Sequence, residues 1–245
     1  MHGFMIGLTW GWMAIGIITF FYLFKKTAPF GRHTTTGWGP MVDNRLGWMI
    51  MEIVSPIMLT MTFHYFANGL AFHQWILLLL WNLHYLNRSI IFPLRIRTNG
   101  KQMPVSIMLS AVGFNIVNGF VNGYFLAVST PASGMLFGVG LVIFLCGFII
   151  NNIADTQLIN LRKPGETGYK IPSGPLFNWI SCPNLSSEII EWFGFALMAM
   201  NIGALSFAIW TFCNLAPRAF AHHKWYVDKF PDYPKSRKAV IPFLW

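Results

Sequence analysis

Residues 176–217, LFNWISCPNLSSEIIEWFGFALMAMNIGALSFAIWTFCNLAP, decide how this chain crosses a membrane. The stretch is long enough for one extended apolar span or for two shorter spans that separate near residues 201–203. If the amino terminus lies outside and the stretch crosses twice, all 17 Lys and Arg residues fall on one side of the membrane. One crossing would strand the cationic carboxyl terminus on the opposite side, against the positive-inside tendency. We therefore predict two spans here.

The composition places the whole chain among multi-pass membrane proteins. Of its 245 residues, 55% are hydrophobic and 10% are charged, and the mean hydropathy is +0.51, outside the range of soluble globular domains. Apolar runs predict five more spans, at about 1–24, 47–68, 71–87, 105–128 and 135–153.

These spans predict an all-α integral membrane protein. Residues 1–245 form a single domain, a bundle of seven transmembrane helices with the amino terminus outside and the carboxyl terminus in the cytosol. A bacterial inner membrane and the endoplasmic reticulum both fit this topology. We expect membrane lipid as a partner and a monomeric protein.

Charge and cysteine content exclude two other classes of function. The net charge of +9 reflects only eight acidic residues, and the basic residues punctuate apolar runs, so no groove for nucleic acid is predicted. The three cysteines, Cys146, Cys182 and Cys213, are scattered without metal-ligand spacing. We therefore predict no metal site and no disulfide framework.

Glu52 is the ionisable residue at membrane depth that most needs an explanation. Such a group costs about 2.5 to 3.5 kcal/mol, and no cation lies three or four residues away along the predicted helix. One interpretation is a carboxyl held near the interface by a partner on another helix. The other is a desolvated carboxyl that donates or relays a hydrogen bond to a buried polar ligand atom.

Tyr85, in the segment HYLNRS at 84–89, gives Glu52 a possible companion. A tyrosine near the end of a span usually belongs to the aromatic belt. However, a very short turn joins the second and third predicted spans, so they are antiparallel neighbours with both residues near their cytosolic ends. A phenol and a carboxyl at one depth suit a single carbonyl oxygen, which is the arrangement that polarises an enone.

Two polar segments fall on the same side of the membrane in this topology. One is the predicted loop at 151–173, and the other is the tail at 218–245. Charge alone fits a tail anchored on anionic lipid, and we expect residues 235–238 to act mainly in this way. Cations also suit phosphates, and carboxylates suit ribose hydroxyls or a carboxamide, so a dinucleotide is a second candidate ligand. No G-x-G-x-x-G fingerprint is present, so such a cofactor would bind within the helical bundle.

The carboxyl half contains a series of long, ordered motifs. They are LRKPGE at 161–166, YKIP at 169–172, SSEIIEWFGFAL at 186–197, TFCNLAPRAF at 211–220, HHKWY at 222–226, KFPDYPKSRKA at 229–239 and IPF at 241–243. Over about the last 95 residues the chain closely resembles the steroid 5α-reductase family. The amino-terminal half matches more loosely, with Glu52 and the HYxxR pattern around Tyr85 and Arg88 as its anchors.

The resemblance implies a seven-helix oxidoreductase that uses NADPH to reduce the Δ4 C=C bond of 3-oxo-Δ4 steroids to 5α-reduced 3-oxosteroids. Glu52 and Tyr85 would bind the 3-oxo oxygen, with Tyr85 as proton donor or polariser. Residues of about 1–128 would form mainly the substrate pocket, and those of about 135–245 mainly the NADPH-binding half. The cofactor-binding positions implied are Asn151, Asp155, Arg162, Tyr169, Asn184, Glu188, Arg218, His222 and Tyr226.

Met51 departs from the family pattern, because the steroid enzymes commonly place Gln before the glutamate. This substitution removes one amide from the carbonyl end of the pocket and keeps other substrates open, namely an enoyl-CoA, a polyprenol or another sterol. A membrane methyltransferase that binds S-adenosylmethionine is a more distant alternative. A transporter with Glu52, Glu188 and Glu191 along an ion path is the alternative outside the enzymes, although the inverted repeats of many carriers are absent.

Overall fold

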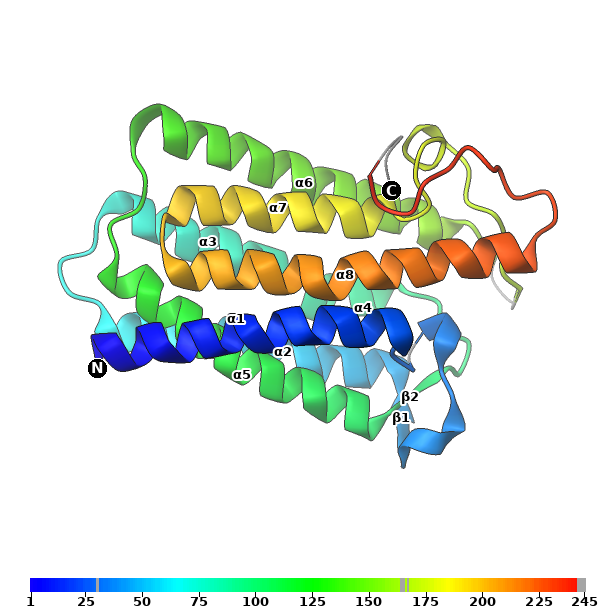
Figure 1. Ribbon diagram of the computed structural model, residues 1–245, viewed down its shortest axis with the longest axis horizontal. Coiled ribbons are helices and arrows are strands. Elements are labelled where there is room, and N and C mark those ends of the chain that lie inside the picture. Colours follow the sequence, from blue (N-terminus) through cyan, green and yellow to red (C-terminus); the bar gives the residue numbers. More distant parts are fainter. Residues whose placement is uncertain (30, 164–165, 167, 242–245) are drawn as a thin grey trace.

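Seven long helices run side by side along the longest axis of the molecule in a computed structural model that describes residues 1–29, 31–163, 166 and 168–241 (Figure 1). They are α1 His2–Lys25, α2 Asn44–Phe66, α3 Phe72–Leu86, α5 Val105–Val128, α6 Gly134–Asn160, α7 Pro183–Ala199 and α8 Ile202–Lys229. Shorter elements are α4 Phe92–Arg95, the π-helical segment η3 Asn87–Ile91, and the 3₁₀ turns η1 Gly31–His33, η2 Thr36–Trp38 and η4 Pro175–Phe177. The all-α prediction is confirmed.

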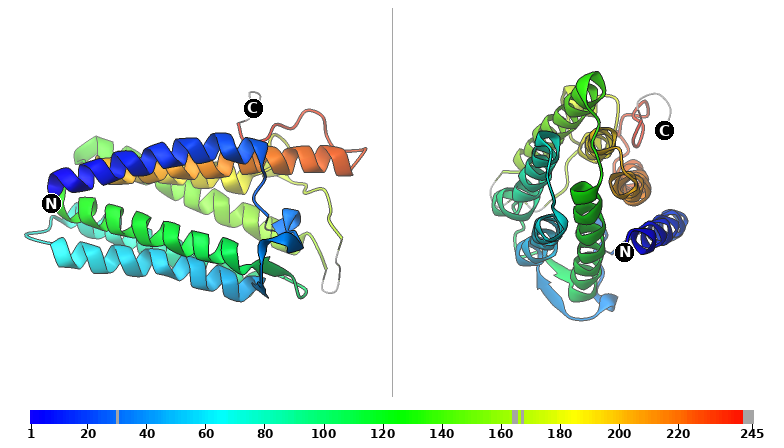
Figure 2. Two further views of the ribbon diagram at one scale, coloured as in Figure 1. Left: turned by 60° about the horizontal axis from the view of Figure 1, so that its bottom comes forward. Right: turned by 90° about the vertical axis from the view of Figure 1, so that its left-hand side faces the viewer.

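Four of the described helices are long and apolar enough to cross a membrane, namely α1, α2, α5 and α6. Figure 2 shows the bundle end on, with α1 on its outside. There α1 packs mainly against α8. Its buried residues Met5, Thr9, Met13 and Gly16 recur every three or four positions, which is the spacing of a single helix stripe.

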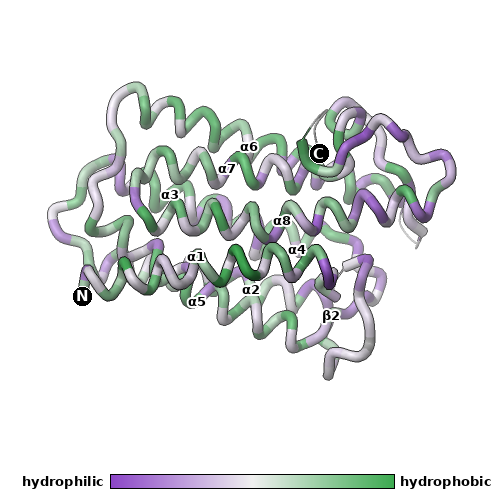
Figure 3. The backbone as a smooth tube through the Cα atoms, viewed as in Figure 1, coloured by the Kyte–Doolittle hydropathy of each residue, from purple (hydrophilic) through white to green (hydrophobic). Residues whose placement is uncertain are grey.

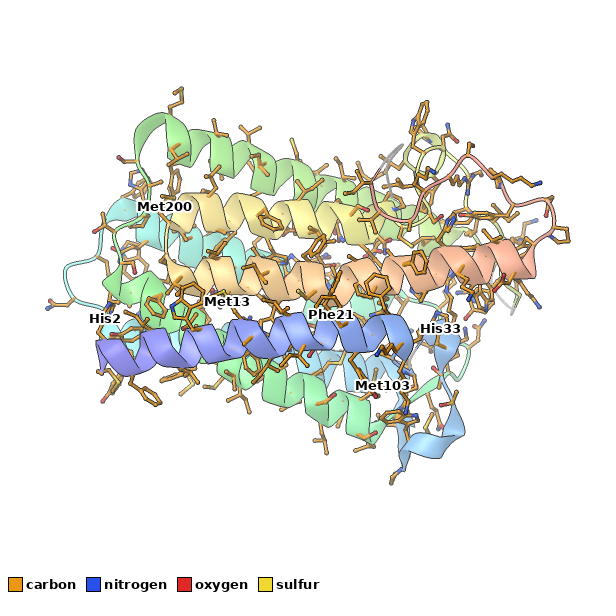
Figure 4. All side chains as sticks on the ribbon, in the orientation of Figure 1. His2, Met13, Phe21, His33, Met103 and Met200 are labelled. Atoms are coloured by element: carbon orange, nitrogen blue, oxygen red, sulfur yellow. The ribbon has the colours of Figure 1, made fainter. Side chains whose placement is uncertain are left out.

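The two ends of the bundle differ in polarity. The amino terminus and the short turns at 67–71, 129–133 and 200–201 gather at one end, and the hydrophilic segments gather at the other (Figures 1 and 3). Figure 4 places His2 and Met200 at the first end, and His33 and Met103 at the second. The 17 Lys and Arg residues all fall within 25–45, 88–101, 162–170 and 218–238, which belong to the hydrophilic end and the helix ends leading to it.

The predicted break within 176–217 is confirmed, because it separates helices α7 and α8. Helix α7 ends at Ala199, and its C-cap Met200 has a left-handed φ of 46° and donates its N–H to the Ala196 carbonyl. The next residue, Asn201, caps α8, because its Oδ1 accepts from the Ala204 N–H at 2.9 Å. An Asn at this position satisfies an amide that otherwise has no partner inside the helix, so the two helices meet with almost no connecting loop.

The first part of the predicted loop and of the predicted tail is helical, so those boundaries were wrong. Residues 151–160 continue α6, and residues 218–229 continue α8. Residues 151–160 contain neither Gly nor Pro, and polar residues alone do not end a helix. The change from apolar to polar residues therefore marks where the apolar surface of α6 and of α8 ends. Both helices continue for about three turns beyond that point.

A two-stranded antiparallel sheet was not predicted. Strand β1, Met41–Asp43, pairs with β2, Gln102–Pro104, and Met41 faces Pro104 in the register. The strand also leads into α2, because Asp43 Oδ1 accepts from the backbone N–H groups of Arg45 and Leu46, each at 3.0 Å. The sheet thus joins the segment before α2 to the segment before α5 at the polar end.

Glycines allow α6 to approach α7 closely. A Cβ atom at Gly147 would lie 2.6 Å from the backbone nitrogen of Glu191, and one at Gly194 would lie 2.5 Å from that of Phe144. Backbone atoms cannot swing aside as the end of a side chain can. Small residues at such contacts are a common way to pack helices in membranes, and here they hold the carboxyl-terminal helices at a fixed distance.

We expect Gly147→Ala to lower the free energy of unfolding by about 1 to 3 kcal/mol, because the added methyl overpacks this contact. Gly138→Ala is the matched control on the same helix, since a Cβ there meets no atom within 4 Å. That change should be neutral or stabilising by up to about 1 kcal/mol. Thermal unfolding of the purified protein in detergent measures both. Equal midpoints for the two variants would contradict the packing inference.

Candidate active site

A cavity of about 430 Å³ lies among α1, α2, α3, α5, α7 and α8, and the three predicted substrate residues line it. Met51 and Glu52 come from α2, and Tyr85 comes from α3. The apolar part of the wall includes Trp12, Trp48, Phe114, Phe207 and Trp210. A carboxyl and a phenol thus face one largely apolar space, as the sequence predicted from their depth on neighbouring helices.

Aromatic packing holds Tyr85 in the wall of this cavity. Its side chain is 4% exposed, and its ring stacks on Trp81 with centroids 5.4 Å apart. Trp192 of α7 lies 6.0 Å away on centroids. Stacked and edge-on aromatic pairs of this kind fix ring orientation as well as burying apolar area, so the phenol is held by neighbours on two helices.

A second, more polar cavity of about 280 Å³ lies toward the polar end, and we call it the cationic cavity because several arginines line it. Seven of the nine predicted cofactor residues line it, namely Asp155, Arg162, Tyr169, Asn184, Arg218, His222 and Tyr226. These come from α6, α7, α8 and the connection between α6 and α7. Asn184 Nδ2 donates to Asp155 Oδ1 at 2.9 Å, so carboxylate and amide groups stand opposite the arginines of the same cavity.

The other two predicted residues lie beside this cavity. Glu188 lines the larger cavity instead. Asn151 lines neither, and its Nδ2 donates to the Asn184 carbonyl at 2.8 Å and to Glu188 Oε2 at 3.5 Å. Asn151 therefore holds the start of α7 in place.

Arg88 and Arg218 stand in the walls of both cavities. The Arg88 guanidinium lies 3.6 Å from Asp155 Oδ2 and 4.0 Å from Glu188 Oε2, and the exposed fractions of these three side chains are 13%, 7% and 12%. It also lies over the Trp48 ring, 5.0 Å from its centroid. The sequence identified Arg88 as part of a motif but gave it no role. The acidic residues that pair with it are far away in the chain.

Arg32 is a second cavity residue that the sequence did not single out. Its guanidinium lies 4.5 Å, 4.9 Å and 5.5 Å from the ring centroids of Tyr226, Trp225 and Tyr169. One nitrogen donates to the Tyr226 hydroxyl at 3.3 Å, whereas Nη1 is buried without a hydrogen-bond partner among the described residues. A buried, unsatisfied guanidinium nitrogen in a cationic cavity is the donor that an anionic ligand oxygen would satisfy.

His33 and His222 form a stacked pair at the edge of this region. Their rings are 5.2 Å apart on centroids, and His33 Nε2 lies 3.1 Å from His222 Nδ1. Burial, with the guanidinium groups of Arg32 and Arg218, lowers the pKa of His33 from 6.5 to about 4. The folded protein therefore keeps this half-buried imidazole neutral at pH values where an unfolded chain would protonate it.

Acidification should destabilise the protein through His33. The unfolded state takes up a proton below about pH 6.5 and the folded state only near pH 4, so stability falls as the pH drops through that window. With allowance for solvent screening, we expect His33→Gln to reduce this loss by about 1 to 2 kcal/mol. Unfolding in detergent at pH 7 and pH 4.5 measures it. Equal losses in the variant and the unchanged protein would contradict the expectation.

The segment after α8 folds back onto the polar end. Ser181 Oγ lies 2.6 Å from His223 Nδ1 and 2.7 Å from the Tyr233 hydroxyl. Arg237 is 6% exposed and donates to the Pro172 carbonyl at 2.9 Å. The prediction that 235–238 acts mainly as a lipid-facing anchor is therefore wrong for Arg237, which holds the tail against the connection between α6 and α7.

Comparison with known proteins gives a consistent family. Residues 101–245 match the family model described as 3-oxo-5-alpha-steroid 4-dehydrogenase. Steroid 5-alpha-reductase DET2 of Gossypium hirsutum is 40% identical over 244 residues, which cover 94% of this chain and 93% of that protein. The 3-oxo-5-alpha-steroid 4-dehydrogenase 1 of Bos taurus is 40% identical over 240 residues, with the same two coverages. The human protein of that name is 36% identical over 245 residues, covering 94% and 92%. The likeness therefore reaches well beyond the carboxyl half.

Proposed function

We propose that this chain, which belongs to the 3-oxo-5-alpha-steroid 4-dehydrogenase family of oxidoreductases, uses NADPH to reduce the Δ4 C=C bond of 3-oxo-Δ4 steroids to 5α-reduced 3-oxosteroids. One observation carries the proposal. An apolar cavity with a carboxyl and a phenol in its wall meets a cationic cavity, and Arg88 and Arg218 belong to both. The names of the relatives supply the substrate class, and the two cavities suit one apolar and one anionic ligand.

The residues of the cationic cavity fit a phosphorylated dinucleotide. Arg32, Arg162 and Arg218 suit its phosphates, and the unsatisfied Nη1 of Arg32 is a donor in reserve. Asp155 and Asn184 suit hydroxyl or carboxamide groups, and Tyr226 offers an aromatic face. NADPH, when bound here, supplies the hydride for C5 of the steroid.

Glu52 and Tyr85 activate the substrate by binding its 3-oxo oxygen. Hydrogen bonds donated by the Tyr85 hydroxyl and by the protonated Glu52 carboxyl draw electron density onto that oxygen and make C5 electrophilic. The negative charge that develops there meets donors already in place in a site walled by aromatic rings. Addition of hydride at C5 leaves an enolate whose oxygen the two groups bind, and addition of a proton at C4 then saturates the former double bond and restores the C3 carbonyl in the same step.

The Met51 side chain forms the wall of the larger cavity next to Glu52. It is 5% exposed and lines the larger cavity, and its backbone carbonyl accepts from Asn115 Nδ2 at 2.7 Å. The thioether offers the carbonyl end of the substrate no strong donor, so the side chain at position 51 contributes no amide to the binding of the oxygen by Glu52 and Tyr85. The same apolar wall would suit a polyprenol or another conjugated lipid, which is the second candidate substrate.

We place the seven long helices across the membrane with the amino terminus outside and the polar end in the cytosol. The supporting observation is that all 17 Lys and Arg residues belong to one end of the bundle and its approaches, as the positive-inside tendency requires. NADPH then enters from the cytosol between the α6–α7 connection and the carboxyl-terminal part of α8. The steroid enters from the lipid, and the protein acts as a monomer.

The decisive experiment is NADPH oxidation by the purified protein with a panel of 3-oxo-Δ4 steroids, enoyl-CoAs and polyprenols. We expect steroid-dependent oxidation and a product two mass units heavier than its substrate. Oxidation with a polyprenol or an enoyl-CoA but with no steroid would transfer the assignment to that substrate class. Binding of S-adenosylmethionine, or ion flux across vesicles without NADPH consumption, would refute a reductase.

Arg162→Ala and Arg218→Ala should each weaken NADPH binding about 10- to 100-fold, because each removes a charge-assisted hydrogen bond to phosphate. Lys163→Ala is the matched control, since Lys163 is exposed next to Arg162 and lies outside the cavity lining. Isothermal titration of the detergent-solubilised protein with NADPH gives the three dissociation constants. Unchanged affinity in both arginine variants would remove these residues from the cofactor site.

A further inference from the structure

A buried ionisable pair joins α3 to α7 outside both cavities. His84 Nδ1 lies 2.7 Å from Glu191 Oε1, and the two side chains are 3% and 0% exposed. Neither residue lines the cavities described above. Glu191 Oε2 is buried without a hydrogen-bond partner among the described residues. Burying a carboxyl with one oxygen unsatisfied costs stability, so this pair calls for a role other than holding the fold together.

The pair is one of two polar links that flank Tyr85. Four residues after His84, Arg88 reaches Glu188, which lies three residues before Glu191 on α7. Within residues 1–29, 31–163, 166 and 168–241 no other hydrogen bond or ion pair joins α3 and η3 to α7. In the sequence, Tyr85 lies between the two links, directly after His84 and three residues before Arg88. The centroids of the Tyr85 and His84 rings are 5.1 Å apart.

The helix changes its geometry immediately after Tyr85. The segment η3, Asn87–Ile91, is π-helical, and the Phe92 N–H donates to the Asn87 carbonyl five residues earlier. A π turn holds one extra residue compared with an α turn. If the turn moved along the chain past Tyr85, that side chain would rotate by about 100° around the helix axis, the angle per residue of an α-helix. The phenol would then leave the cavity wall.

Two contacts hold Glu191, the partner of His84, in place. The backbone of Glu191 is so close to Gly147 of α6 that a Cβ there would lie 2.6 Å from its nitrogen. The next residue, Trp192, packs edge-on against the His84 ring with centroids 4.6 Å apart. A hydrogen bond to a carboxyl held in this way fixes the rotation of α3 at the residue before Tyr85, because rotation of this turn of helix would carry the imidazole away from Glu191.

We propose that the His84–Glu191 pair is a positioning device for Tyr85, which fixes the start of the π turn and so keeps the phenol directed at the substrate carbonyl. The inference rests on the proposed role of Tyr85 in reduction. His84 and Glu191 act through Tyr85 and touch neither the steroid nor the cofactor. Their loss should therefore lower kcat and leave NADPH affinity unchanged.

The test uses a double variant that removes the hydrogen bond and retains the packing. His84→Phe with Glu191→Met replaces both polar partners by apolar side chains of similar shape, a change that is often neutral for stability. Glu191→Gln, which keeps an acceptor at Oε1, is the conservative control. Each is made alone and with Tyr85→Phe, and kcat, KM, NADPH affinity and unfolding midpoint are measured with the steroid that the unchanged protein reduces. If the double variant does not fold, Glu191→Met alone takes its place, because it leaves a neutral imidazole and not a buried carboxyl without a partner.

We expect the double variant to lose about 10- to 100-fold in kcat, the effect of a catalytic group displaced by about 1 Å, with an unchanged unfolding midpoint. Glu191→Gln should stay within about threefold of the unchanged protein, since its amide oxygen can take the place of Oε1. Combined with Tyr85→Phe, the double variant should lower the residual rate by less than about twofold, because residues that act as a unit are not additive.

Three results would overturn the proposal. They are an unchanged kcat in the folded double variant, a lower unfolding midpoint with normal kcat, and an equal loss of rate with and without Tyr85. Failure of the proposed function is distinguishable from these outcomes. In that case the unchanged protein itself shows no steroid reduction, or Tyr85→Phe retains its full rate.

Discussion

Tyr85→Phe should lower the rate of steroid reduction about 10²- to 10⁴-fold, the contribution expected of a general acid. The change removes one oxygen atom from a residue that is 4% exposed and stacked on Trp81, so the ring should remain in place. NADPH affinity should stay within about twofold, because Tyr85 does not line the cationic cavity. Single-turnover measurements with testosterone or progesterone separate the chemical step from binding.

Tyr124→Phe is the matched control for this experiment. Tyr124 is also 4% exposed, and its hydroxyl lies 3.0 Å from His2 Nδ1 near the amino terminus. Its loss should leave the rate of reduction unchanged. A near-normal rate in Tyr85→Phe would refute the role of the phenol. If both variants lost rate equally, removal of any buried hydroxyl would be the simpler explanation.

The second large effect concerns stability. Arg88→Met should lower the free energy of unfolding by about 3 to 5 kcal/mol, because it leaves Asp155 and Glu188 buried without their cation. Both carboxylates belong to side chains that are 12% exposed or less. For a pair exposed to water, loss of the cation would cost little stability, because water would solvate the carboxylates. Here neither Asp155 nor Glu188 is exposed enough for water to replace Arg88.

Lys170→Met tests whether burial is responsible. Lys170 Nζ lies 2.6 Å from Glu166 Oε2, a shorter pair than that of Arg88, but its two side chains are 47% and 36% exposed. Removing an exposed pair typically costs at most about 1 kcal/mol. Chemical unfolding in detergent compares the two variants. An Arg88→Met protein as stable as Lys170→Met would show that the acids find other partners.

Much of the fold follows from hydrophobic length and charge. The helix break at Asn201 was predicted from the need to bring all cations to one end, and the structure has an N-cap there. Helix ends in water were less predictable. Apolar length says where a segment leaves the lipid, and the sequence at 151–160 contains no residue that ends a helix, so α6 continues.

The candidate site divides in the same way. Glu52 was identified because a carboxyl is costly at its depth in a helix, and Tyr85 was identified because a very short turn places it beside Glu52 at the same depth; both signals lie within a short stretch of sequence. Arg88 and the pair His84–Glu191 depend on partners about 100 residues away, and no local pattern reports such a contact. The acid at Glu191 did carry a signal, since a carboxyl deep in an apolar helix requires a partner, but the sequence alone could not name it.

The wall shared by the two cavities has a consequence for the order and strength of ligand binding. Arg88 and Arg218 border both spaces, so a polyanion that draws either guanidinium toward itself also reshapes the neighbouring apolar space. Thermodynamic linkage makes this influence mutual. If the first ligand changes the affinity of the protein for the second by some factor, the second changes the affinity for the first by the same factor. If both cavities bind the proposed ligands, we therefore expect the two ligands to bind cooperatively.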